Sequence, residues 1–125
     1  MSKILVIDDS KFSRRRVVEP LLQAGYDIEE AVNGEEGLTR YASFEPDCVV
    51  TDLLMPVLNG QGFLRRLRAG GSTTPVIVVT ADVQTSSCDH CKELGISGFL
   101  NKPFQTDELL DNVERALREA NEVAV

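Results

Sequence analysis

The segment Lys3-Ile4-Leu5-Val6-Ile7-Asp8-Asp9 decides the fold class, because a short apolar run that stops at two acids is typical of a buried strand. Five strands are predicted in all, at residues 3–8, 27–31, 47–52, 75–80 and 97–101. Most of them are continuous Val, Ile and Leu rather than alternating. That pattern is typical of parallel strands covered by helices on both faces.

The stretches between these strands have a 3.6-residue apolar period, so helices are predicted there. The predicted apolar stripes are Leu38, Tyr41 and Ala42; Phe63, Leu64 and Leu67; and Leu109, Leu110, Val113, Ala116 and Leu117. Predicted N-caps are Asn33, Asn59 and Thr106, and predicted helix ends are Gly25 and Gly95. Five strand–helix alternations predict one α/β domain over residues 1–125, with a doubly wound, five-stranded parallel sheet.

The composition excludes several classes of partner. Twenty Asp and Glu against thirteen Lys and Arg give a formal net charge of −7, so the field repels phosphate backbones and anionic membranes. We expect no direct contact with nucleic acid. The longest apolar runs, such as 4–7 and 76–79, are about a fifth of the roughly 20 residues that cross a bilayer, so no membrane span is expected. Three cysteines and no signal-peptide core favour a cytoplasmic protein.

Side chains able to do chemistry follow the predicted strands, at the sheet edge where ligands of such folds bind. They are Asp8 and Asp9 after the first strand, Asp52 after the third, Thr80 at the end of the fourth and Lys102 after the fifth. Three carboxylates brought together repel one another, and a hard divalent cation such as Mg²⁺ relieves that repulsion. With a lysine beside them, they predict a site that receives a phosphoryl group on a carboxylate.

Four motifs together resemble the receiver domain of two-component response regulators. They are ILVIDDS at 4–10, TDLLMP at 51–56, VVTA at 78–81 and NKPF at 101–104, and they follow the family's order and spacing over the whole chain. The resemblance implies a flavodoxin-like fold with strand order 2-1-3-4-5. It also implies either a stand-alone regulator of the chemotaxis type or an excised receiver domain.

The resemblance assigns roles to the residues at the sheet edge. Asp52 corresponds to the phosphoacceptor and Lys102 to the family's lysine. Asp8 and Asp9 correspond to the acidic pair that holds Mg²⁺ together with Asp52, and Leu54 would add its backbone carbonyl. The resemblance therefore implies a signalling phosphoacceptor that assists its own phosphotransfer and autodephosphorylation, not an enzyme in the usual sense.

The resemblance also implies partners and a switch. A histidine kinase or a histidine phosphotransfer protein would phosphorylate Asp52. Thr80 would then move toward the new oxygens, Phe99 would rotate into the vacated space, and binding to a downstream protein target would change. The bond between Lys102 and Pro103 is expected to be cis.

Two rival functions remain as alternatives. A small Mg²⁺-dependent phosphatase with an aspartyl intermediate would carry Asp-x-Asp after the first strand, where this chain has Asp8-Asp9-Ser10. A flavin-binding, flavodoxin-like carrier would need a phosphate loop rich in Ser, Thr and Gly, where this chain has Lys11-Phe12-Ser13-Arg14.

Three further features have weaker interpretations. Cys88 and Cys91 flank the only histidine, but without a second ligand pair we expect one cysteine to face the core instead of a zinc site. The three consecutive arginines at 14–16 are interpreted as a solvated helix face or as a kinase-docking surface. Leu54 and Asp82 lie near the expected path of the hydrolytic water, and Leu54 is hypothesised to slow its attack.

Overall fold

The computed structural model describes residues 2–81 and 85–123, with the backbone alone at 85–88 and 122–123. Five strands and five helices alternate along this part of the chain. The strands are β1 (Lys3–Ile7), β2 (Asp27–Ala31), β3 (Cys48–Thr51), β4 (Val76–Thr80) and β5 (Gly98–Asn101). The helices are α1 (Lys11–Gln23), α2 (Gly34–Phe44), α3 (Gly60–Ala69), α4 (Thr85–Leu94) and α5 (Thr106–Val123).

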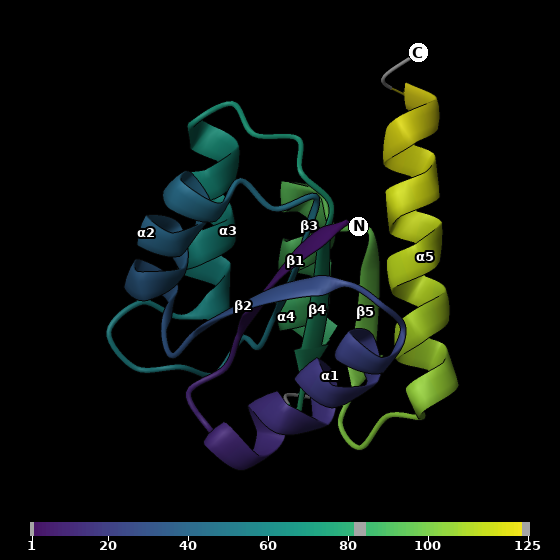
Figure 1. Cartoon of the computed structure of the whole chain (residues 1–125). Coiled ribbons are helices and arrows are strands. Elements are labelled where there is room, and N and C mark those ends of the chain that lie inside the picture. The colour runs from purple at the N-terminus through teal and green to yellow at the C-terminus, as the bar shows by residue number, and fades with distance from the viewer. Residues whose placement is uncertain (1, 82–84, 124–125) are drawn as a thin grey trace.

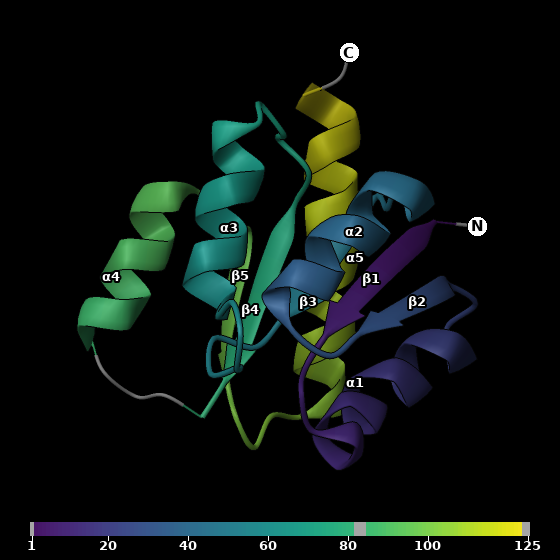
Figure 2. The same ribbon diagram turned by 90° about the vertical axis from the view of Figure 1, so that its left-hand side faces the viewer.

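The strands form one sheet in the order β2-β1-β3-β4-β5, and all their pairings are parallel. Helices α1 and α5 cover one face, while α2, α3 and α4 cover the other (Figures 1 and 2). The predicted doubly wound α/β fold and its strand order are therefore confirmed. Among the residues that the structure describes, no helix has the length and apolarity needed to cross a membrane.

Each face of the sheet has its own apolar core, because successive side chains of a strand point to opposite faces. Ile4 and Val6 of β1 pack with the cluster under α1 and α5, whereas Leu5 and Ile7 pack with the cluster under α2, α3 and α4. Both clusters include fully buried residues from β1, β3 and β4. The central strands are thus buried on both sides, and this explains their continuous apolar sequences.

The strand register brings the site residues together. Ile7 pairs with Thr51 across β1 and β3, so the residues that follow them, Asp8 and Asp52, leave neighbouring strands side by side. The two strands end one residue earlier than predicted, and both carboxylates therefore belong to loops. This edge, where the strands run out, lies at the bottom of the view in Figure 1.

Two of the three predicted helix caps are confirmed. The side chain of Asn33 accepts a hydrogen bond from the Glu36 N–H, and that of Asn59 accepts one from the Gly62 N–H. The predicted ends also hold, since Gly25 and Gly95 have φ of 97° and 87°, in the left-handed region that favours glycine.

The third predicted cap, Thr106, is wrong by one residue. Helix α5 begins at Thr106 itself, and the carbonyl of Gln105 accepts the Leu109 N–H. The Glu108 carboxylate accepts the Gln105 N–H in turn, at 3.1 Å. An acid in the first turn thus satisfies the backbone N–H of Gln105, the residue that precedes the helix.

Candidate functional site

The centre of the site is the ammonium group of Lys102, which follows β5. Its Nζ donates to Asp52 Oδ2 at 2.7 Å, to Asp8 Oδ2 at 2.9 Å and to Ser13 Oγ at 2.6 Å. These groups come from the ends of β5, β3 and β1 and from the first turn of α1. The structure therefore brings together three of the residues predicted from the strand ends, and it adds Ser13.

Backbone donors fix both carboxylates. Asp52 Oδ1 accepts the Leu54 N–H at 3.1 Å, and Asp8 Oδ1 accepts the Ser10 N–H at 3.0 Å. Asp8 is 3% exposed and Asp52 8% exposed. Each carboxylate thus has one oxygen on the backbone and one on Lys102, which holds both groups in defined orientations at the sheet edge.

The loop after β3 is packed tightly against the start of α3. A Cβ placed on Gly60 would lie 2.1 Å from the Asp52 carbonyl oxygen, so only glycine allows the helix to approach so closely. In the same loop Val57 has a φ of 67°, a left-handed conformation that β-branched residues rarely adopt. The loop that follows Asp52 therefore combines close backbone packing with a strained backbone conformation.

The electrostatics of the site depend on the shared cation. Burial alone lowers the pKa of Lys102, but the hydrogen bonds and charges of Asp52 and Asp8 outweigh it and raise the pKa above its ordinary value. The ammonium is therefore held in its charged form. A fixed positive charge beside a carboxylate can stabilise additional negative oxygens at this position.

The two predicted switch residues occupy neighbouring strands. Thr80 ends β4 with no exposed surface, and its carbonyl accepts the Lys102 N–H at 2.8 Å. Phe99 on β5 is opposite Val78 on β4, is partly buried, and packs against the core cluster under α2, α3 and α4. The peptide bond between Lys102 and Pro103 is cis, as expected.

The remaining predicted metal ligands lie at the rim of the site. Asp9 is exposed, and Leu54 is 57% exposed on the loop after Asp52. Within the residues that the structure describes, no three His, Cys, Asp or Glu side chains are placed to hold a metal ion. The carboxylates of Asp8 and Asp52 do, however, contact the same ammonium group. Mg²⁺ commonly uses one or two carboxylates and keeps several waters. The donor set, which is all oxygen, fits such an ion.

Sequence reasoning missed two residues of α1. It gave no role to Ser13, and it interpreted Arg14 only as part of a solvated face or docking surface. Arg14 instead donates to the Asp8 carbonyl at 2.8 Å and to the Glu30 carboxylate at 2.7 Å. A useful signal was available: a helix that begins three residues after Asp8 must place its first turn beside the acids.

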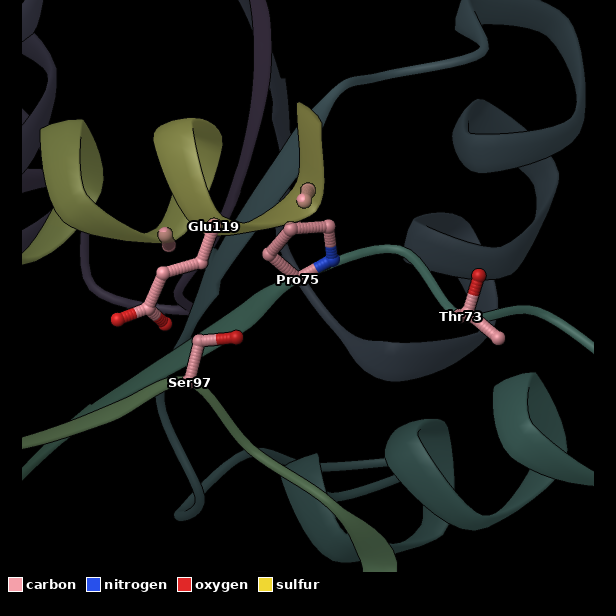
Figure 3. A pocket seen from close by; sticks show the side chains of 6 residues that line it. Thr73, Pro75, Ser97 and Glu119 are labelled. Carbon is pink, nitrogen blue, oxygen red and sulfur yellow. The ribbon is translucent and has the colours of Figure 1, made fainter. Parts of the chain in front are cut away.

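Two residues of the cysteine motif, His90 and Cys91, lie on α4. Cys91 is fully buried in the core, as expected of one of the two cysteines, while the side chain of Cys88 and the whole of Asp82 lie outside the described residues. His90 contacts Arg65 across α4 and α3, at 3.1 Å. A hollow of about 260 Å³, lined in part by Thr73, Ser97 and Glu119, lies at the sheet edge where β4 and β5 begin (Figure 3).

Two kinds of comparison match the chain to curated families and proteins. The family model of the response regulator receiver domain matches residues 4–114. The chain is 38% identical over 116 residues to "Response regulator MprA" of Mycolicibacterium vanbaalenii, covering 93% of this chain and 50% of that protein. It is 37% identical over 118 residues to "Protein CcdB" of Bacillus subtilis, covering 94% and 98%. The chain thus spans about half the length of the MprA relative and nearly all of the other.

Solved structures agree with this match. Chemotaxis response regulator CheY4 of Vibrio cholerae superposes with a TM-score of 0.84 at 32% identity, covering 93% of this chain and 98% of that one. The Francisella response regulator 1452 receiver domain superposes with a TM-score of 0.89 at 31% identity, covering 96% and 99%. The buried acids, the shared lysine and these matches agree: the chain belongs to the response regulator receiver domain family, whose members are signalling phosphoacceptors.

Proposed function

We propose that Asp52 is the phosphoacceptor of a single receiver domain spanning residues 1–125. The observation that carries this assignment is the hydrogen bond of 2.7 Å between Asp52 and Lys102. Asp52 presents a carboxylate at the sheet edge, oriented by the Leu54 N–H, beside a cation that can receive further oxygens. Asp8 contacts the same cation and accepts the Ser10 N–H with its other oxygen, and Asp9 is exposed.

The reaction transfers a phosphoryl group from a phosphohistidine. A carboxylate oxygen of Asp52 attacks phosphorus in line, the P–N bond breaks, and the imidazole leaves with the bonding electron pair and takes up a proton. The product is an acyl phosphate on Asp52. Lys102 stabilises the charge on the transferring oxygens, because its ammonium is already within hydrogen-bonding distance of the carboxylate.

Receiver domains generally use Mg²⁺, and we propose which residues hold it here. Asp8, Asp9, Asp52 and the backbone carbonyl of Leu54 are the candidate ligands. When bound, the ion offsets negative charge on the phosphoryl oxygens. The oxygen-only donor set and the pairing of Asp8 with Asp52 around one cation support this assignment.

The proposed switch uses Thr80 and Phe99. In response to phosphorylated Asp52, the Thr80 hydroxyl turns toward the new oxygens and Phe99 rotates into the space that it leaves. Thr80 lies on β4, which neighbours β3, and Phe99 lies on β5, the edge strand beyond β4. The partial burial of Phe99 leaves it room to change its packing. The surface formed by β4, β5 and their helices would then bind a downstream protein.

The proposed phosphoryl donor is a histidine kinase or a histidine phosphotransfer protein. The net charge of −7 opposes direct contact with nucleic acid. Hydrolysis of the acyl phosphate resets the switch, and we propose that the exposed side chain of Leu54 hinders the attacking water.

The test uses a small phosphodonor. The whole chain is incubated with phosphoramidate and Mg²⁺, and the product is analysed by intact-protein mass spectrometry. We expect one added phosphoryl group that is stable to acid, labile to base and absent from Asp52→Asn. The control Asp89→Asn, at an exposed position on α4, should be phosphorylated normally. Phosphorylation of Asp52→Asn would refute the assignment, and steady release of phosphate without Asp52 would favour the phosphatase alternative.

A further inference from the structure

We propose that Ser13 is a positioning residue that holds the Lys102 ammonium beside the phosphoacceptor. This inference rests on the proposed function of Asp52. The contact that carries it is the one between Lys102 Nζ and Ser13 Oγ, at 2.6 Å, which joins residues 89 positions apart in the sequence.

The backbone of Ser13 is fixed where the contact needs it. The side chain of Ser10 caps helix α1 by accepting the Ser13 N–H at 3.2 Å. Ser13 therefore lies in the first turn, next to the Asp8 loop, and is partly buried. Its hydroxyl reaches Lys102 from a third direction, separate from those of Asp8 and Asp52.

The hydrogen-bonding capacity of the ammonium matches its surroundings. A lysine ammonium has three N–H donors and no acceptor. The three donors meet Asp8, Asp52 and Ser13, one each. Since the ammonium can only donate, Ser13 Oγ accepts, and the serine keeps its own proton for another partner.

Ser13 differs from the other two acceptors because phosphotransfer does not change it. Phosphorylation converts an oxygen of Asp52 into the bridging oxygen of an acyl phosphate, and Asp8 is a proposed metal ligand. The hydroxyl of Ser13 is neutral and takes part in neither event. It is therefore the contact able to hold the flexible four-carbon stem of Lys102 in place while its other two acceptors change.

The first arm of the test is kinetic. The rate constant for phosphorylation of Asp52 by phosphoramidate at saturating Mg²⁺ is compared in wild type, Ser13→Ala, Ser13→Thr and Ser43→Ala. Loss of one hydrogen bond to a charged group should slow Ser13→Ala about tenfold. Ser13→Thr keeps a hydroxyl and should restore most of the rate. Ser43, which is exposed on α2 and bonds only to backbone carbonyls of that helix, is the matched control.

The second arm needs neither Mg²⁺ nor phosphorylation. Ammonium protons that are held by three acceptors exchange slowly with water, so the Lys102 group should give a resolved signal in nitrogen-15 NMR of the wild-type protein. We expect Ser13→Ala to lose or broaden that signal and Ser13→Thr to retain it. A merely structural role of Ser13 would lower the urea midpoint without changing the Lys102 resonance.

The outcomes separate this inference from the proposed function. A Ser13→Ala rate within about twofold of wild type, too small for a lost bond to a charged group, would overturn the positioning role. So would a Ser13→Thr variant as slow as the alanine variant, or an unchanged Lys102 signal. In these cases phosphorylation of Asp52 would still stand. Failure of the wild-type chain to be phosphorylated at Asp52 would overturn both proposals.

Discussion

The Lys102 ammonium and the Asp52 carboxylate lie 2.7 Å apart although 50 positions separate them in the sequence. Both side chains are largely buried, at 19% and 9% exposure, and the same ammonium also contacts Asp8. Two buried carboxylates thus share one cation. Their mutual repulsion is tolerated because that cation lies between them.

Replacing Lys102 with Met should therefore destabilise the protein. Removal of the cation leaves two buried carboxylates without a counter-charge, and breaking a buried pair in this way costs about 3 kcal/mol. Urea denaturation at neutral pH without Mg²⁺ measures the loss. The control Lys92→Met, at an exposed position on α4, should change the free energy of unfolding by less than about 0.5 kcal/mol.

The double variant Lys102→Met with Asp52→Asn tests the cause of that loss. With one carboxylate neutralised, the remaining acid has no buried charge to oppose it, so part of the stability should return. We expect an interaction energy above about 1 kcal/mol in the double-mutant cycle. Strictly additive effects would show that Lys102 stabilises the fold through its packing instead of its charge.

The positions of Asp8, Asp52 and Lys102 were predictable from the sequence because topology determines them. Parallel strands joined by helices align their carboxyl ends at one edge of the sheet. Residues just beyond those ends therefore lie close together, even when the exact last residue of each strand is not known. An error of one residue at β1 and β3 did not matter, since the acids stay at the same edge.

The role of Ser13 was not predictable in this way. It depends on the rotation of α1 about its axis and on the conformation of the lysine side chain. The apolar period of the sequence does not determine either of these with the precision that a hydrogen bond requires. Helix α2 shows the same limit. Ala42 was predicted on its apolar stripe but is exposed, whereas Gly37 is buried with its missing Cβ position 2.6 Å from Ile7 Cδ1. Close backbone approach at Gly37, together with the core-facing side chains of Leu38, Tyr41 and Phe44, determines how α2 packs.

Leu54→Asn should shorten the lifetime of the phosphorylated protein. The exposed leucine borders Asp52, and replacing it with a polar side chain lets water approach the acyl phosphate and be oriented there. We expect hydrolysis to become several-fold faster, measured as loss of the phosphoryl group by mass spectrometry after removal of the donor. Leu22→Asn, at an exposed leucine on the distant end of α1, should leave the lifetime unchanged. Equal lifetimes for Leu54→Asn and wild type would rule out the hindrance.

Val57→Asn should stabilise the protein. Val57 is 74% exposed and has a φ of 67°, so it loses little packing on replacement, and its left-handed backbone costs about 1–2 kcal/mol. Asn tolerates this conformation better, and we expect a gain of about 1 kcal/mol in urea denaturation. Val32→Asn, a partly exposed valine with ordinary φ, should give no gain. A loss of stability in Val57→Asn would mean that contacts of the valine outweigh the strain.

Gly60→Ala should be strongly destabilising. The new Cβ would lie 2.1 Å from the Asp52 carbonyl oxygen and 2.8 Å from the Leu53 Cα, and both are backbone atoms that cannot turn aside. We expect a loss of more than about 2 kcal/mol, as for other overpacked sites. Gly70→Ala at the end of the same helix meets its nearest neighbours at 3.6 Å and should be neutral within about 1 kcal/mol. Equal effects of the two substitutions would contradict the close approach of α3 to the acceptor loop.

The fully buried thiol of Cys48 in β3 should make the protein sensitive to alkali. Burial raises the pKa of Cys48 from 9.0 to about 12; a backbone hydrogen bond of Val49 opposes the rise, and the charge of Asp47 adds to it. Below pH 9 both the folded and the unfolded thiol are protonated, so the group has no effect on stability there. Above pH 9 the unfolded state releases this proton while the folded state keeps it. Stability is therefore lost as pH rises, up to about 4 kcal/mol near pH 12.

Cys48→Ala removes this titration, so the comparison isolates it. At pH 8 the wild-type protein should be the more stable, because the alanine leaves a cavity beneath α1 and α5. That advantage should shrink by about 2–3 kcal/mol between pH 8 and pH 11, measured by urea denaturation at each pH. Tyr26 is present in both proteins, so the effect of burial on its pKa, which is the largest cause of its rise, cancels in the difference. If the two stability curves run parallel up to pH 11, the Cys48 thiol ionises as easily in the folded chain as in the unfolded one.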